Sequence, residues 1–341
     1  MADFQKAKKI VRNYIDDFDN ASDKDLTKVL KKYTTKDYHW RGMHPFYEQH
    51  GATAVIKSFW KPFRKAFSPI QRRVDIFFAG ANDCDDGQSQ WVVNLGNFLG
   101  LFDNDWLGIP STSKMAFLRY AEFHRVTPAG KIAETALFCD IISVMHQAGH
   151  YPLPPMTGAA FLYPGPRTHD GLQYKKQQAK EAIKTMDLLN EMIADLTALN
   201  GDDAKRCPPE VLARTWKEDM IWYGPFGIGA SYTIRRYQQQ HQYPFRDNLH
   251  SKVFNGHIAR FAEGNYCGFF GWPNLNNKNA GGFLGMTAND THAPMRVVDI
   301  YRREGDKLAE NWVYIDILHY LNEQGLNVLE RMKQINRNTT L

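Results

Sequence analysis

The sequence predicts an α+β fold repeated in tandem: two cone-shaped domains, each a curved, mostly antiparallel sheet wrapped around N-terminal helices. Three observations lead to this prediction. Short motifs recur in the same order in both halves, helical patterns precede strand patterns in each half, and a Pro- and Gly-rich stretch separates the halves. The length of 341 residues also exceeds one typical core and suits two domains.

The internal repeat rests on the order of its matches. Ile132-Ala133-Glu134 leads to Asp140 in the first half, and Leu308-Ala309-Glu310 leads to Asp316 with the same spacing in the second. Further matches are Leu107-Gly108-Ile109 with Leu284-Gly285-Met286, Arg119 with Arg296, Asp37–Trp40 with Asp219–Trp222, Gly51-Ala52 with Gly229-Ala230, and Phe67 with Phe245. The collinear order predicts a first domain over 1–150, a linker over 151–170 and a second domain over 171–341.

Each half reads as helices followed by strands. Apolar residues recur at helical spacing from Phe4 to Phe18 and from Leu172 to Leu196, and further helices are predicted over 54–67 and 232–242. Strands are predicted over 74–78, 91–93, 115–120 and 132–140, and over 253–261, 266–270, 296–301 and 308–316. A curved sheet closed on one side by helices leaves a pocket at its open mouth.

The last predicted strand of each half carries the candidate chemistry. Because side chains alternate along a strand, Glu310, Trp312, Tyr314 and Asp316 share one face, and Glu134, Ala136, Phe138 and Asp140 share the matching face. A carboxylate at the end of each strand is therefore expected to face the pocket.

These motifs resemble the SnoaL-like polyketide cyclases, within the larger nuclear-transport-factor-2-like (NTF2-like) cone fold, once in each half. The segment Trp106–Lys114 resembles that family's Phe-x-Gly-Ile-Pro-Pro-Thr-Gly-Lys loop, and Glu310–Asp316 resembles its Glu-x-Trp-x-x-x-Asp strand. Gln147-Ala148-Gly149 and Gln324-Gly325 resemble its Gln-Leu-Gly ending. The resemblance implies that the final Asp of the strand, here Asp316 and Asp140, is an acid/base that removes a proton next to a carbonyl.

The two halves depart from the family pattern in different places. Ala136 stands where the Trp is expected, and Met286-Thr287-Ala288-Asn289 stands where the Pro-Pro-Thr-Gly run is expected. The Gly-Thr-His expected before the loop is found in neither half. The same cone fold hosts hydrolases, dehydratases, isomerases and binding proteins, so the resemblance bears on fold more than on reaction.

The residues themselves leave two interpretations of Asp316 and Asp140. In an apolar pocket, desolvation would raise the carboxyl pKa toward neutrality and allow acid/base work without metal or cofactor. Alternatively, each Asp caps the helix that follows by accepting backbone N–H bonds. His319, three residues beyond Asp316, is a further candidate for hydrogen bonding to a carboxylate or a substrate oxygen.

Several aromatic side chains either stack a flat ligand or fill the core. The candidates for substrate binding are Trp312, Tyr314, Trp222, Tyr223, His257, His39, Trp40 and Trp106.

Composition excludes several other classes of protein. The net charge of +5 comes from scattered basic pairs without a long basic run, which does not favour nucleic-acid binding. Four cysteines stand far apart without a CxxC pair, and no His or Cys spacing is typical of zinc, so neither a metal nor a cofactor is expected. The sequence contains no apolar signal core and no apolar run of membrane-spanning length, which predicts a cytoplasmic protein without membrane contact.

The leading hypothesis is a cofactor-independent enzyme that cyclises, isomerises or eliminates from a small carbonyl compound, with one half catalytic. A binding protein without catalysis and a hydrolase in which the Asp activates water remain alternatives. The fused halves are expected to form an intramolecular pseudo-dimer, giving a monomer or a loose homo-oligomer whose partner is a small-molecule substrate.

Overall fold

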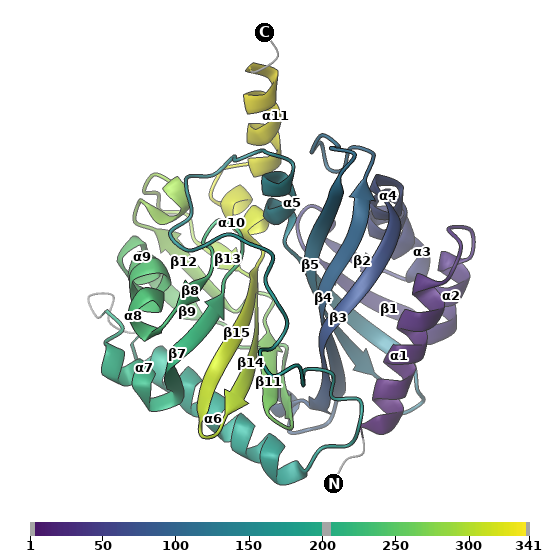
Figure 1. The fold of residues 1–341 in the computed structure, drawn as a ribbon, viewed down its shortest axis with the longest axis horizontal. Coiled ribbons are helices and arrows are strands. Elements are labelled where there is room, and N and C mark those ends of the chain that lie inside the picture. Colours follow the sequence, from purple (N-terminus) through teal and green to yellow (C-terminus); the bar gives the residue numbers. More distant parts are fainter. Residues whose placement is uncertain (1–3, 200–205, 339–341) are drawn as a thin grey trace. The chain divides into compact units, whose positions relative to one another are not determined.

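The computed structural model describes residues 4–199 and 206–338 and divides them into two compact units (Figure 1). Unit 1 runs to Tyr151 and also takes in Pro164–Lys176 and the C-terminal segment from Leu329. Unit 2 comprises Pro152–Tyr163 and Gln177–Val328. The predicted linker is thus shared, with its first part packed into unit 2 and its second part into unit 1.

Unit 1 is built on a six-stranded sheet in the order β2-β1-β6-β5-β4-β3, in which β1 and β6 are parallel and the other neighbours antiparallel. Its strands are β1 (Thr34–Gly42), β2 (Glu48–His50), β3 (Phe67–Ala81), β4 (Gln90–Phe102), β5 (Met115–Val126) and β6 (Ile132–Cys139). Its helical elements are α1 (Gln5–Asp19), α2 (Leu26–Tyr33), α3 (Ala52–Val55), the π-helical turn η1 (Ile56–Trp60), α4 (Lys61–Ala66), the 3-10 turn η2 (Asp83–Asp85), α5 (Ile141–Gln147) and most of α11 (Val328–Asn338).

Unit 2 has a six-stranded sheet in the order β10-β11-β14-β15-β7-β8 and a separate three-stranded sheet, β13-β12-β9. Its strands are β7 (Trp216–Tyr223), β8 (Ser231–Tyr232), β9 (Leu249–Phe254), β10 (Ala259–Glu263), β11 (Tyr266–Phe270), β12 (Leu275–Asn279), β13 (Ala293–Met295), β14 (Val297–Glu304) and β15 (Lys307–Ile315). Its helical elements are α6 (Ala179–Ala198), α7 (Pro209–Thr215), α8 (Ile234–Tyr237), the π-helical turn η3 (Gln238–Gln242), α9 (Tyr243–Asn248), the 3-10 turn η4 (Phe283–Gly285) and α10 (Ile317–Glu323).

The first long helix of each unit buries one apolar face. In α1 the buried side chains include Val11, Ile15 and Phe18, at the spacing that the sequence predicted. The second predicted helix begins later than expected, at Ala179, because Leu172 forms a β-bridge to Phe77 of unit 1. Among the described residues, no helix combines the length and apolarity needed to cross a membrane.

The duplicated frame is closest around the two π-helical turns. Gly51 precedes α3 with φ 77°, and Thr233 precedes α8 with φ 69°, so these two residues occupy matching positions. Continuing from this point, Phe63 matches Phe245. The sequence matches of Gly51 with Gly229 and of Phe67 with Phe245 were therefore wrong by four residues, because a helix-sized slip preserves apolar spacing.

The units differ most at the strands that follow these turns. In unit 1, β3 and β4 are long and paired along their length, with a register shift between Val74 and Ile76. In unit 2 residues 255–258 separate β9 from β10, and 271–274 separate β11 from β12. The single strand predicted over 253–261 is thus two strands, since Gly256 takes a φ of 93° that extended chain does not adopt.

Candidate functional site

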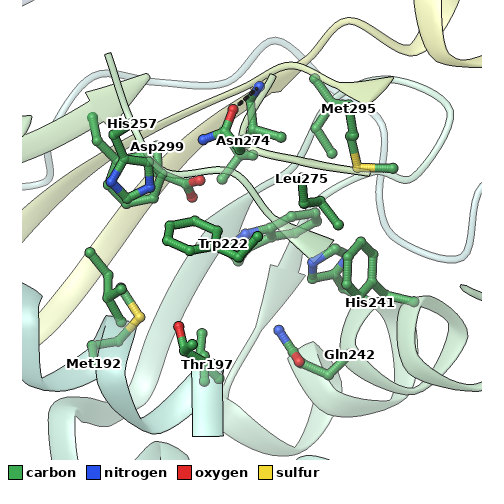
Figure 2. A pocket seen from close by; sticks show the side chains of 18 of the residues that line it. Met192, Thr197, Trp222, His241, Gln242, His257, Asn274, Leu275, Met295 and Asp299 are labelled. Carbon is green, nitrogen blue, oxygen red and sulfur yellow. Dashed lines mark hydrogen bonds between the residues drawn. The ribbon is translucent and has the colours of Figure 1, made fainter. Parts of the chain in front are cut away.

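A largely apolar cavity opens in unit 2 where these strands are interrupted (Figure 2). About 900 Å³ not occupied by protein atoms lies within its lining, a volume that includes open solvent. The lining comes from α6, β7, the η3–α9 region, both sides of the strand breaks, β14 and β15: Met192, Ile193, Leu196, Thr197, Trp222, Tyr237, His241, Gln242, Phe245, Arg246, Phe254, His257, Phe269, Asn274, Leu275, Met295, Val297, Asp299, Tyr301, Val313 and Ile315.

Asp299 supplies the carboxylate of this cavity, and no other described lining residue is acidic. It lies in β14, opposite Phe269 and Val313 on the neighbouring strands. Asn311 Nδ2 donates a hydrogen bond of 3.2 Å to Asp299 Oδ1 and also donates to the Ile300 carbonyl oxygen. Burial raises the pKa of Asp299 to about 6, although hydrogen bonds with the side chains of Asn311 and Tyr301 oppose the shift.

Two histidine rings belong to the polar part of the lining, and each is stacked on an aromatic ring. His257 lies 3.9 Å from Phe269 between ring centroids, and His241 lies 4.0 Å from Trp222. Burial lowers the pKa of each to about 3, so both are neutral at physiological pH. Figure 2 places Asp299 and His257 toward one end of the cavity and His241 and Gln242 toward the other.

The position of His241 follows from the local sequence. Pro244 has no backbone N–H, so the carbonyl oxygen of Gln240 loses its helical partner and instead accepts a 2.6 Å hydrogen bond from Thr157 Oγ1. The helix widens into the π-helical turn η3 at this point. His241 lies in this turn, in contact with Trp222 and Tyr237.

The arginine of the lining has a structural role. Arg246 donates from Nε to Gln242 Oε1 at 3.2 Å and from a terminal nitrogen to the Leu199 carbonyl at the end of α6. Its counterpart in unit 1, Arg64, donates to the Asp19 carbonyl at the end of α1. Both arginines thus hold the C-terminus of the first long helix, where cations are favoured.

The predicted catalytic aspartates lie at helix starts outside this cavity. Asp316 is fully buried, caps α10 through the His319 backbone N–H at 3.2 Å, and lies 3.3 Å from an Arg296 terminal nitrogen. Asp140 caps α5 in the same way and lies 3.4 Å from Arg119. Both have the geometry of the capping interpretation.

The predicted substrate-binding residues of unit 2 divide between the cavity and its surroundings. Trp222 and His257 line the cavity. Trp312 and Tyr314 alternate with the lining residues Val313 and Ile315, so they lie on the other face of β15. Tyr223 stacks on Trp312, with 5.5 Å between ring centroids. The ring of the buried His319 lies 3.9 Å from Glu323.

The predicted substrate-binding residues of unit 1 lie within its own core and sheet. Trp40 packs 5.9 Å from Phe59, and Trp106 belongs to an aromatic cluster with Phe63. His39 lies 2.6 Å from Glu48 in an ion-pair geometry. These side chains contact neighbours of unit 1, although the buried Trp106 Nε1 has no hydrogen-bond partner among the described residues.

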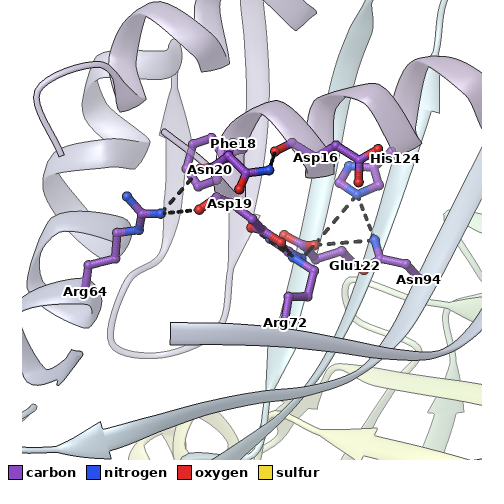
Figure 3. A network of polar contacts seen from close by, with 9 residues as sticks. All are labelled: Asp16, Phe18, Asp19, Asn20, Arg64, Arg72, Asn94, Glu122 and His124. Carbon is purple, nitrogen blue, oxygen red and sulfur yellow. Dashed lines mark hydrogen bonds and ion pairs between the residues drawn. The ribbon is translucent and has the colours of Figure 1, made fainter. Parts of the chain in front are cut away.

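Charged side chains fill the part of unit 1 that corresponds to the cavity (Figure 3). Glu122 faces Leu137 on the next strand, as Asp299 faces Val313, so the two acids hold matching positions. Arg72, which is 1% exposed, lies 2.5 Å from Glu122 and 2.9 Å from Asp19. Its guanidinium packs on the rings of Trp60, Phe98 and Tyr120.

Arg72 has an apolar counterpart in unit 2. Arg72 pairs with Phe98 across β3 and β4, and Phe254 pairs with Leu275 across β9 and β12. Both Phe254 and Leu275 line the cavity. The cavity therefore coincides with the exchange of a buried arginine for a phenylalanine at its mouth.

Within residues 4–199 and 206–338, no group of three or more His, Cys, Asp or Glu side chains is arranged to hold a metal ion. Neither Asp299 nor His241 was among the site residues predicted from the sequence. The signal for Asp299 was a carboxylate inside the apolar run Val297–Tyr301, and the signal for His241 was its place before a helical proline.

The chain is similar in structure to several solved proteins. No protein-family model and no curated protein sequence matches the chain. A candidate SnoaL-like polyketide cyclase from Jannaschia sp. CCS1 has a TM-score of 0.34 and 16% identity, over 41% of this chain and 89% of its own. An NTF2-like protein from Burkholderia thailandensis E264 has a TM-score of 0.32 and 19% identity, over 42% and 97%. IdmH, a candidate polyketide cyclase from Streptomyces antibioticus, has a TM-score of 0.33 and 14% identity, over 40% and 97%.

Proposed function

We propose that unit 2 is a cofactor-independent acid/base catalyst that acts on a small, flat carbonyl compound, with Asp299 as the base. The observation that carries this proposal is the position of Asp299 as the acidic residue of an apolar cavity. Its pKa of about 6 leaves the carboxylate ionised at neutral pH, yet basic enough to accept a proton from carbon.

The reaction needs no external reagent. Asp299 takes a proton from the carbon next to a carbonyl, and the electron pair of that C–H bond moves onto the carbonyl oxygen as an enolate. In an isomerisation the protonated Asp299 returns the proton to another carbon. In a cyclisation the enolate carbon attacks a second carbonyl of the same molecule, and the new alkoxide takes the proton back.

The surroundings of Asp299 suit this role. Asn311 and Tyr301 both hydrogen-bond to the Asp299 carboxylate, which lines the cavity. Trp222 and Phe269 offer flat surfaces for a ring-bearing ligand. The sequence resemblance to SnoaL-like cyclases also favours proton abstraction next to a carbonyl, although it implied Asp316 for that role.

Unit 1 is proposed to be structural. Glu122 holds the position of Asp299, but Arg72 and the side chains around it occupy the space that a ligand would need.

The proposal is tested by exchange of carbon-bound hydrogen in D2O. The full chain is incubated with flat aryl ketones, 2-tetralone first, and deuterium incorporation next to the carbonyl is followed by NMR. We expect Asp299→Asn to reduce enzyme-dependent exchange by about 100-fold or more. Glu122→Gln is the matched control in unit 1 and is expected to leave exchange unchanged.

Two outcomes would contradict this assignment. If Asp316→Asn abolished exchange in a folded protein while Asp299→Asn did not, the base would be Asp316. If the wild-type protein bound these ketones, and Asp299→Asn bound them equally well, but neither catalysed exchange, unit 2 would be a binding domain. Hydrolysis of an ester analogue without exchange would indicate the hydrolase alternative.

A further inference from the structure

Asp299 is a cavity carboxylate without a cationic partner in the protein. It forms no ion pair among the described residues, and it is only half-buried, since it faces the cavity. Five fully buried carboxylates, by contrast, each form an ion pair with an arginine: Glu122, Glu134, Asp140, Glu310 and Asp316. An ionised carboxylate in apolar surroundings costs free energy unless a positive charge offsets it, so Asp299 favours a cation from outside the chain.

Unit 1 carries such a cation within its own chain (Figure 3). The Arg72 guanidinium lies 2.5 Å from Glu122, the residue that matches Asp299. Its central carbon lies 4.7, 5.2 and 5.6 Å from the ring centroids of Phe98, Tyr120 and Trp60. A planar guanidinium both pairs with carboxylates and packs on aromatic faces. Unit 1 therefore shows how this frame holds a flat cation.

The four side chains around the Arg72 guanidinium have counterparts in unit 2 that all line the cavity. The strand pairing and the last residues of the two π-helical turns give these matches: Asp299 for Glu122, Leu275 for Phe98, Val297 for Tyr120 and Gln242 for Trp60. Phe254 stands in place of Arg72 itself. Because Leu, Val and Gln are smaller than the rings that they replace, the space accepts a cation larger than one guanidinium.

The rest of the lining suits a positive charge beside Asp299. Burial keeps His241 and His257 neutral at physiological pH, so neither repels a cation. Arg246 donates to Gln242 Oε1 at 3.2 Å, and Figure 2 places Gln242 at the end of the cavity away from Asp299. Six aromatic side chains, whose faces attract cations, line the cavity: Trp222, Tyr237, Phe245, Phe254, Phe269 and Tyr301.

We propose that the cavity of unit 2 binds a flat organic cation with N–H donors, such as an aryl amidinium or a protonated ring amine. Its positive charge lies beside Asp299, as the Arg72 guanidinium lies beside Glu122 in unit 1. The inference goes beyond the proposed function, because it concerns the charge of the ligand and does not require that Asp299 transfer a proton. For the proposed reaction, it means that the carbonyl substrate also carries a positively charged nitrogen.

The inference is tested with three flat probes of nearly the same shape and different charge: benzamidinium, benzamide and benzoate. Binding to the full chain is measured by isothermal titration calorimetry at about pH 8, where Asp299 is ionised. We expect benzamidinium to bind at least about tenfold more tightly than benzamide, because a hydrogen bond between two charged groups is stronger than one between neutral groups. Benzoate should bind most weakly, because the carboxylate of Asp299 repels it.

Two substitutions locate the bound cation. Asp299→Asn should lower the affinity for benzamidinium to about that for benzamide, because the negative charge is gone. Phe254→Arg supplies from within the chain the guanidinium that unit 1 has, and it should lower the affinity for benzamidinium by about tenfold or more. Phe254→Met is the matched control, since it changes the side chain without adding charge, and it should keep the preference for benzamidinium.

Several results would overturn the inference. Benzamide binding as tightly as benzamidinium would do so, as would the absence of benzamidinium binding at millimolar concentration. A preference for benzamidinium that persisted in Asp299→Asn would place the cation elsewhere and overturn it as well. The comparison of the three probes uses the wild-type protein, so it does not depend on the folding of any variant.

The binding test and the exchange test can fail separately. A preference for benzamidinium without deuterium exchange of the ketones would support this inference and contradict the proposed function. Exchange of 2-tetralone without a preference for benzamidinium would support the proposed function and overturn this inference.

Discussion

Unit 1 and unit 2 carry an acidic side chain at the same position of the same kind of sheet, in opposite environments. Glu122 is 1% exposed and lies 2.5 Å from Arg72, which is itself packed between aromatic rings. Asp299 has no arginine at the matching position, where Phe254 stands, and faces a cavity instead. The same backbone frame thus yields either an interior filled by charged and aromatic side chains or a cavity.

Three differences between the two units accompany the cavity of unit 2. One is the exchange of Arg72 for Phe254, which removes the cation that would fill the space and neutralise the acid. Another is the interruption of the long strands by residues 255–258 and 271–274, which opens the sheet beside Asp299. The third is His241 in place of Phe59. Each change can be reversed or transferred experimentally.

The largest expected effect concerns the stability of unit 1. Arg72→Met removes the cation and leaves Glu122 buried without it, which should lower the free energy of unfolding by about 3–5 kcal/mol. Urea denaturation of the intact chain, followed by circular dichroism, measures this loss. Adding Glu122→Gln should recover part of it, because the uncompensated charge is then gone.

The corresponding substitution in unit 2 serves as a control for the loss of stability in Arg72→Met. Phe254→Met exchanges one apolar side chain for another at the same position and should cost less than about 1.5 kcal/mol. If Arg72→Met cost no more than Phe254→Met, the ion pair would not be what holds the interior of unit 1 together, and the comparison of the two units would lose its energetic basis.

The second effect tests whether an arginine alone closes the site. Phe254→Arg places a guanidinium where unit 1 has one, so it should pair with Asp299, lower the pKa of that carboxyl and occupy the cavity. We expect exchange of 2-tetralone to fall about 100-fold, since the base is both weaker and blocked. Phe254→Leu keeps the mouth apolar and should change the rate by a small factor. Undiminished exchange in Phe254→Arg would mean that the strand breaks, and not the arginine, decide which unit is open.

More of the fold than of the candidate site could be predicted from the sequence. The order of repeated motifs, the helix-then-strand arrangement and the turn residues all depend on local chemistry, and they predicted two α+β units. The site depends on which face of β15 points inward. Both faces of that strand are buried from Leu308 to Ile315, so its alternation carries no polarity signal. The predicted residues Trp312 and Tyr314 lie on the face opposite to the one that lines the cavity.

The cavity itself could not be predicted from the sequence, for a related reason. Its existence depends on what is missing from the interior, and a missing arginine is visible only once Arg72 and Phe254 have been aligned. That alignment needs the register of four strands, including the break at Gly256, where the sequence predicted a continuous strand. Asp316 and Asp140, at the end of a strand and the start of a helix, matched the family pattern equally well as caps.

The third expected effect is a pH dependence that belongs to unit 2. Asp299 must be ionised to accept a proton, and its pKa is about 6, so exchange should rise with pH up to that value and level off above it. Below pH 6 the rate should fall about tenfold for each pH unit, because the ionised fraction falls by that factor. His241 and His257, each with a pKa of about 3, add no step between pH 4 and 8. Glu122→Gln should leave the profile unchanged, whereas a shifted profile would assign the titration to unit 1.

The smallest expected effect concerns Asn311, which donates a hydrogen bond to the proposed base Asp299. Asn311 donates to Asp299 in unit 2, and Thr135 is its counterpart in unit 1, where it lies 2.9 Å from His124. Replacing Asn311 by Leu removes a hydrogen bond that favours the ionised carboxylate, so the acid limb of the exchange profile should move up by about one pH unit. The plateau rate above that limb should change less, because a more basic carboxylate compensates in part for its looser position. Thr135→Val should not move the limb. A shift of equal size in the Asn311→Leu and Thr135→Val variants would contradict this prediction. It would mean that the acid limb of the exchange profile responds to a general loss of stability and not to the hydrogen bond at Asp299.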